Sequence, residues 1–109
     1  MTSVSLQWNR DFALEQTAGD EELLAELITL FQDSAQSDFQ QLQEAVTAGD
    51  SDQVIAAAHS LKGASASLGI EGIRALAMEI EEGVRGGQSE VDQAKLAAMG
   101  TLIKELQGL

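Results

Sequence analysis

Apolar residues recur at steps of three and four between residues 20 and 49, and this periodicity constrains the fold more than any other feature of the sequence. The spacing places them along one side of an α-helix of about 27 residues, on the order of 40 Å long. Asp20 suits the N-cap of this helix, and Gly49 is placed to end it. The stripe comprises Leu24, Leu27, Ile28, Phe31, Ala35, Phe39, Leu42 and Val46. An apolar stripe of this kind faces a core, so we expect further helices to pack against it.

A second long helix and a third are expected after Gly49. Asp50, with Gln53 three residues later, has the pattern of a capping box, and the helix that it opens should run until Gly69 ends it. The third helix is predicted from about Gly72 to Val84. Its apolar side consists of Ile73, Leu76, Ala77, Ile80 and Val84.

The C-terminal part of the chain predicts a loop followed by a last helix. The sequence RGGQS at 85–89 is typical of a loop, and Ser89 with Asp92 provides a weaker capping signal. The stripe of the last helix comprises Leu96, Met99, Leu102, Ile103 and Leu106.

The N-terminal residues predict one short additional helix. Trp8, Phe12 and Leu14 indicate a helix that caps one end of the core and ends at Gly19. Four long apolar-striped helices with short connections pack most simply as an antiparallel bundle. The predicted fold class is therefore all-α, an antiparallel four-helix bundle with a short N-terminal capping helix. We expect residues 1–109 to form it as a single domain.

The composition excludes several classes of function. Eighteen acidic residues against six basic ones give a formal charge of −12, which repels nucleic acid phosphates and anionic membrane surfaces. No apolar run approaches the roughly 18 residues of a membrane span, and the start MTSVSLQWNRD has no secretory signal pattern. We therefore expect a cytoplasmic protein with no nucleic acid or membrane partner. Because the bundle accounts for its own apolar stripes, we expect a monomer.

The only histidine, His59, is predicted to point outward from the second long helix. At 100° per residue, the core face of that helix consists of Val54, Ala57, Leu61, Ala64, Ser65 and Leu68. The residues within about 60° of His59 lie nearly opposite that face. They are Asp52, Ile55, Ala56, Lys62, Gly63 and Ala66. This surface is small, partly apolar and nearly flat, unlike the row of charges on an ordinary solvated helix face.

The neighbours of His59 suit phosphoryl transfer. An uncharged imidazole offers a nucleophilic lone pair near neutral pH, and Lys62, at i+3, brings a mobile positive charge to the same surface. Gly63 costs a helix roughly 1 kcal/mol relative to alanine, and the absence of a side chain lets another protein approach closely. Phosphoryl transfer requires mainly positioning and charge stabilisation, so a nucleophile, a cation and an open face could suffice. The alternatives are an idle surface histidine and an ordinary solubilising lysine.

The sequence AHSLKGASASLG at 58–69 closely resembles the signature of histidine-containing phosphotransfer (HPt) domains of multistep phosphorelays. GDEELLAELITLF at 19–31 and LQEAVTAGDSDQVIAAAHSLKG at 42–63 are similar to the preceding helix and loop of that family. LAMEIE at 76–81 is similar to its following helix. The resemblance implies a four-helix bundle with an exposed phospho-accepting histidine.

The resemblance also implies roles for individual residues. His59 would accept a phosphoryl group on Nε2 from the aspartyl phosphate of one receiver domain and pass it to the aspartate of another. Lys62 would stabilise the phosphoryl group, and Gly63 would leave space for the receiver. Glu81 matches a position that orients the histidine ring in the family. Its alternative is an i,i+4 ion pair with Arg85.

The remaining expectations concern partners and cofactors. Receiver domains of response regulators, and a hybrid sensor kinase, are the expected partners, with magnesium on the receiver and no cofactor or metal in this chain. We expect Ile55, Ala56, Ala66 and Arg74 to bind the partner, and Ser65 to serve packing. No nucleotide-binding glycine loop is present, so the chain is expected to be a phosphotransfer intermediate rather than an ATP-dependent kinase.

Other functions are left open by the sequence alone. A helical adaptor could bind or sequester a receiver through the same face without chemistry, and replacing His59 would leave such binding intact. The start methionine and the complete predicted bundle favour a free-standing protein, and the alternative is a domain of a larger kinase. One histidine without cysteine offers too few ligands for a metal site, and no paired nucleophile suggests hydrolysis.

Overall fold

The computed structural model describes residues 5–88 and 90–109, and the regular structure in these residues is helical. An isolated backbone bridge between Trp8 and Ile70 is the one strand-like pairing in the described residues. None of the described helices is long and apolar enough to cross a membrane. The helices are α1 (Arg10–Gln16), α2 (Glu21–Ala48), α3 (Ser51–Ser67), α4 (Glu71–Arg85) and α5 (Gln93–Gln107).

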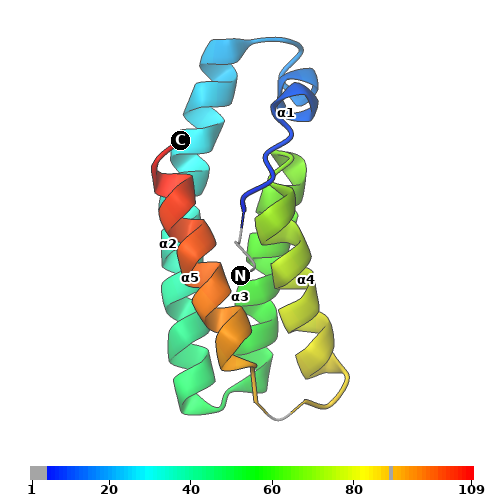
Figure 1. The fold of residues 1–109 in the computed structure, drawn as a ribbon, viewed down its shortest axis with the longest axis vertical. Helices are drawn as coiled ribbons and strands as arrows, with labels where there is room; N and C mark the ends of the chain where they lie inside the picture. Colours follow the sequence, from blue (N-terminus) through cyan, green and yellow to red (C-terminus); the bar gives the residue numbers. More distant parts are fainter. Residues whose placement is uncertain (1–4, 89) are drawn as a thin grey trace.

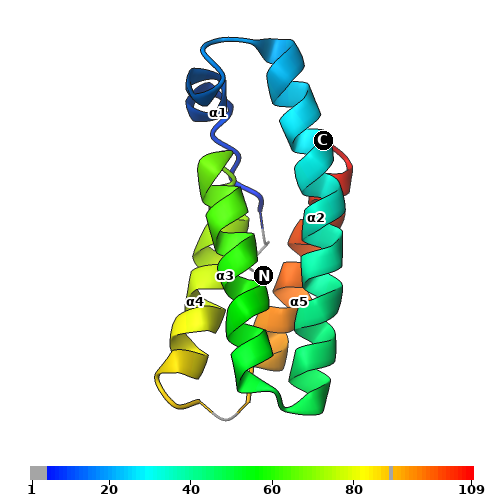
Figure 2. The same ribbon diagram turned by 180° about the vertical axis from the view of Figure 1, so that it is seen from behind.

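The four long helices run antiparallel to one another in chain order (Figures 1 and 2). Helix α3 packs between α2 and α4, and α5 closes the bundle by packing against α2 and α4. The molecule measures 43 × 31 × 21 Å, with its longest dimension set by the direction of α2 (Figure 1). The expected all-α fold, a four-helix bundle with a short N-terminal helix, is confirmed.

The predicted apolar stripes form the core of this bundle. Every stripe residue expected on α2, α4 and α5 is buried or half-buried. Several side chains in the centre have almost no solvent exposure, and they come from all four long helices. These are Leu42, Leu61, Ile73, Met99, Leu102 and Leu106.

Side-chain caps begin α2 and α3 where the sequence predicts them. The Asp20 carboxylate accepts the Leu23 N–H at 3.0 Å, and Gly49 ends α2 with a left-handed φ of 68°. The Asp50 carboxylate accepts the Gln53 N–H at 3.2 Å. The reciprocal half of the predicted capping box is not formed, because the Asp50 N–H donates to the Ala45 carbonyl at 3.0 Å.

The loop before α5 differs slightly from the prediction. Arg85 belongs to α4, so the connection begins at Gly86. Asp92 is the N-cap of α5, and its carboxylate accepts the Ala94 N–H at 2.8 Å. The prediction for Ser89 lies outside the described residues.

The N-terminal helix is shorter than predicted. Helix α1 ends at Gln16, and the turn that follows is closed by a hydrogen bond of 2.8 Å from the Gly19 N–H to the Leu14 carbonyl. Phe12 is 37% exposed. Trp8 precedes the helix, and its indole Nε1 donates to the Leu68 carbonyl at 2.9 Å. This long-range bond explains why the expected helical position of Trp8 is wrong.

Residues 5–9 cross the turn between α3 and α4. The Gly72 N–H donates to the Leu6 carbonyl at 2.7 Å, and the Asn9 N–H donates to the Gly69 carbonyl at 2.8 Å. Leu6 is buried in the core. The segment therefore fastens the α3–α4 hairpin, whose two helices carry the candidate site.

Gly72→Ala should destabilise the protein because this crossing leaves no room for a side chain. A Cβ atom at position 72 would overlap the Ser5 carbonyl oxygen and lie 2.8 Å from the Leu6 carbonyl oxygen, and both are backbone atoms. We expect a loss of about 2 kcal/mol in the free energy of unfolding, measured by urea denaturation. Gly63→Ala is the matched control, since its Cβ meets nothing within 4 Å and alanine favours the helix. Equal effects of the two substitutions would contradict this account.

Candidate functional site

Helix α3 presents His59 to solvent. The predicted core face of α3 is buried except for Ala64, which is half-buried, while the His59 side chain is 63% exposed. The helical-wheel prediction of an outward imidazole therefore agrees with the structure.

Glu81 of α4 lies beneath the imidazole, and its carboxylate contacts three basic side chains. Glu81 as a whole residue is only 3% exposed. His59 Nδ1 lies 3.1 Å from Glu81 Oε2, and Lys62 Nζ lies 2.7 Å from Oε1. Arg85 contacts Oε2 at 3.0 Å. The two predicted alternatives for Glu81 place it in contact with His59 or with Arg85, and in the structure it contacts both through the same oxygen, Oε2.

The charge of Glu81 determines how the imidazole is protonated. The Lys62 ammonium lowers the pKa of Glu81 to about 2, against the opposing effect of burial, with smaller contributions from Arg85 and His59. An ionised carboxylate only accepts hydrogen bonds, so Nδ1 must carry the proton. The neutral imidazole then has its lone pair on Nε2, which has no hydrogen-bond partner among the described residues.

Gly63 leaves the surface beside His59 open. It is exposed, and a Cβ atom built on it would meet nothing within 4 Å. Nothing within the chain requires glycine at this position, because its φ is not positive and no other group approaches it closely. The space beside Gly63 is therefore open to another molecule.

The predicted partner-binding residues are only partly gathered at this surface. Ala56 is exposed, and Ile55 and Ala66 are half-buried on α3. Arg74 forms an ion pair with Glu71 at 2.7 Å. It makes no recorded contact with Glu81, which lies almost two turns further along α4.

Ser65 faces away from the imidazole. Its side chain is fully buried, and its hydroxyl donates to the Leu61 carbonyl at 2.6 Å. This position is that of a packing residue, as the sequence indicates.

The sequence did not predict an apolar groove between α2 and α3. The groove, with a volume of about 470 Å³, is lined mainly by Leu27, Leu30, Phe31, Ala64 and Leu68. Leu30 is highly exposed and stands outside the buried stripe of α2. An apolar residue off the predicted stripe was the signal that could have located this groove.

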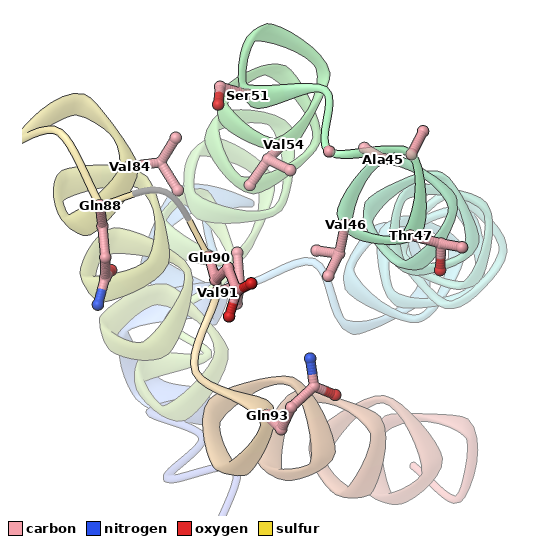
Figure 3. Close-up of a pocket in the computed structure, with 12 residues that line it drawn as sticks. Ala45, Val46, Thr47, Ser51, Val54, Val84, Gln88, Glu90, Val91 and Gln93 are labelled. Atoms are coloured by element: carbon pink, nitrogen blue, oxygen red, sulfur yellow. The ribbon is translucent and has the colours of Figure 1, made fainter.

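A cavity at the N-terminal end of α3 is separate from the His59 site. It has a volume of about 420 Å³ and lies where α2 turns into α3 and the α4–α5 connection passes (Figure 3). Val46, Val54 and Val91 contribute to its wall, with Gln93 at its edge (Figure 3). None of the candidate site residues lines it. The candidate chemistry is thus on an open helix surface.

The described residues place no group of three His, Cys, Asp or Glu side chains where they could hold a metal ion.

The fold and the site define an all-helical bundle that presents one histidine, held by a buried carboxylate, on an open face. The sequence matches the model of the Hpt domain family over residues 26–109, and the chain belongs to this family. Members act in phosphorelays as histidine phosphotransfer carriers that interact with receiver domains and have no kinase activity of their own.

A solved structure has the same fold. It is the HPT domain from the Hpt sensor hybrid histidine kinase of Shewanella, which is 22% identical and superimposes with a TM-score of 0.74. The alignment covers 94% of this chain and 92% of that domain. A search of the curated proteins found no match.

Proposed function

We propose that this protein accepts a phosphoryl group on His59 from a receiver-domain aspartyl phosphate and passes it to the aspartate of a second receiver. The observation that supports this most directly is the contact of 3.1 Å between His59 Nδ1 and the buried Glu81 carboxylate. It leaves Nε2 as the nucleophilic atom of an exposed ring.

The transfer requires no proton to move. Nε2 of His59 attacks the phosphorus, a P–N bond forms, and the bond between phosphorus and the aspartate oxygen breaks, so that the aspartate leaves as a carboxylate. The proton on Nδ1 stays in place, and the ring becomes positively charged beside the ionised Glu81 carboxylate. Transfer to the second receiver follows the same steps in reverse.

Lys62 and the receiver supply the remaining charge stabilisation. The flexible stem of lysine allows the Lys62 ammonium to turn from Glu81 to the phosphoryl oxygens. We place the magnesium ion of the reaction on the receiver. We also propose that Ile55, Ala56, Ala66 and Arg74 contact the receiver around the open surface at Gly63.

Phosphoryl transfer between purified proteins tests this function. A receiver phosphorylated on aspartate with radioactive phosphate is mixed with the protein, and an unlabelled second receiver is added later. We expect acid-labile, base-stable label on this chain, followed by its loss to the second receiver. Label that never appears on the chain with any receiver from the same cell contradicts the proposal.

Gly63→Leu should block docking while the imidazole stays reactive. Gly63 is exposed and a Cβ atom built on it meets nothing within 4 Å, so the added side chain would extend into the open space beside His59. We expect transfer from a receiver to fall by about tenfold or more, an effect of misplacing the reacting groups. Phosphorylation by the small donor phosphoramidate should proceed at the native rate. If both donors are slowed equally, Gly63 does not act through access.

A further inference from the structure

Arg85 contacts Glu81 on a different oxygen from Lys62. Both Nε and a terminal nitrogen of the Arg85 guanidinium lie 3.0 Å from Oε2, the oxygen that also receives the His59 Nδ1–H. Lys62 lies beside Oε1, which has no hydrogen-bond partner of good geometry among the described residues. The two cations therefore do not compete for the same atom, and one can leave while the other remains.

Departure of Lys62 changes the surroundings of a buried charge. When its ammonium turns to the phosphoryl group, Oε1 loses its neighbour at 2.7 Å. A buried carboxylate without compensation is costly, so Glu81 would tend to follow the ammonium or turn toward solvent. Either movement would break its contact with His59 Nδ1, at the stage when the ring gains positive charge.

We propose that Arg85 is a positioning residue of the transfer reaction, which holds the Glu81 carboxylate against His59 Nδ1 while Lys62 is engaged by the phosphoryl group. This inference rests on the proposed function. Arg85 acts through Glu81 and touches none of the reacting atoms. The planar guanidinium of Arg85 reaches Oε2 with two nitrogens, which suits a fixed contact better than a mobile one.

The Lys62→Ala variant imitates the stage at which the ammonium has left Glu81. The ¹⁵N NMR signals of the imidazole report which ring nitrogen carries the proton, and His59 is the only histidine in the chain. We expect the native protein, Lys62→Ala and Arg85→Ala each to keep the proton mainly on Nδ1. The double variant Lys62→Ala/Arg85→Ala should lose this preference. A double variant that keeps it overturns the inference.

Transfer rates from a phosphorylated receiver provide the second readout. Arg85→Ala should slow transfer by about five- to tenfold, the size of a charge-assisted hydrogen bond discounted for its exposure. Arg85→Lys should recover part of the rate, because it retains an i,i+4 cation for Glu81 but lacks the planar guanidinium. Arg10→Ala is the matched control, since it removes a comparable exposed Arg–Glu pair, with Glu21, far from the site.

The outcomes separate this inference from the function on which it rests. If the native protein accepts no phosphoryl group, the proposed function fails and this inference fails with it. If the native protein transfers and Arg85→Ala matches its rate, only the inference is overturned. A slower Arg85→Ala that Arg85→Lys does not rescue, or a double variant with an unchanged ring tautomer, also overturns it, because Arg85 would then act other than by holding Glu81.

Discussion

His59→Gln should accept no detectable phosphate from a phosphorylated receiver, a reduction on the order of 10³-fold or more. Glutamine has no nucleophilic ring nitrogen, and the chain contains no second histidine that could replace it. The fold should not change, because the His59 side chain is largely exposed and contributes nothing to the core. The measurement is the amount of acid-labile, base-stable label on each protein after mixing with the receiver.

The same variant separates phosphoryl transfer from an adaptor function. Receiver binding, measured by calorimetry, should survive His59→Gln, since the open surface at Gly63 is unchanged. Ser67→Ala changes an exposed residue two turns further along α3. It serves as a control, which should accept phosphate at the native rate. If the native protein binds receivers but never carries label, the adaptor interpretation replaces the phosphotransfer one.

The long helices could be predicted because their signals are local. Asp20 caps α2 through a backbone N–H three residues away, and Gly49 ends it through its own φ. The position of Trp8 could not be predicted in this way, since it depends on a hydrogen bond to the Leu68 carbonyl, 60 residues along the chain. No periodicity within the first nine residues could indicate that contact. The start of the N-terminal helix was therefore predicted too early.

The candidate site was predictable in part for the same reason. The outward direction of His59 follows from the spacing of apolar residues on α3 alone. The contact with Glu81 joins two helices, so it depends on the register with which α3 and α4 pack. Pairing with Arg85 within α4 and contact with His59 across the helices looked like alternatives in the sequence. In the structure both contacts form, and both are made to the same oxygen, Oε2.

Acid should destabilise the protein through Glu81, and Glu81→Gln should weaken that dependence. The Glu81 pKa is about 2 in the folded protein, below its ordinary value of 4.5, so unfolding at intermediate pH takes up a proton. The contribution of this carboxylate to stability is therefore fully present above about pH 5 and is lost as the pH falls toward 2. Between pH 6 and pH 3 it should lower the free energy of unfolding by about 1–2 kcal/mol, allowing for the partial exposure of Lys62 and Arg85.

Urea denaturation at the two pH values measures this contribution as a difference between variants. The other acidic residues also titrate in this range, and comparison of Glu81→Gln with the native protein removes their common effect. Glu82→Gln is the matched control, because Glu82 is an exposed neighbour on α4 with no ion pair recorded among the described residues. It should lose as much stability between pH 6 and pH 3 as the native protein does. If Glu81→Gln loses as much as Glu82→Gln, the buried carboxylate is not held in its ionised form by Lys62 and Arg85, and the assignment of the proton to His59 Nδ1 loses its basis.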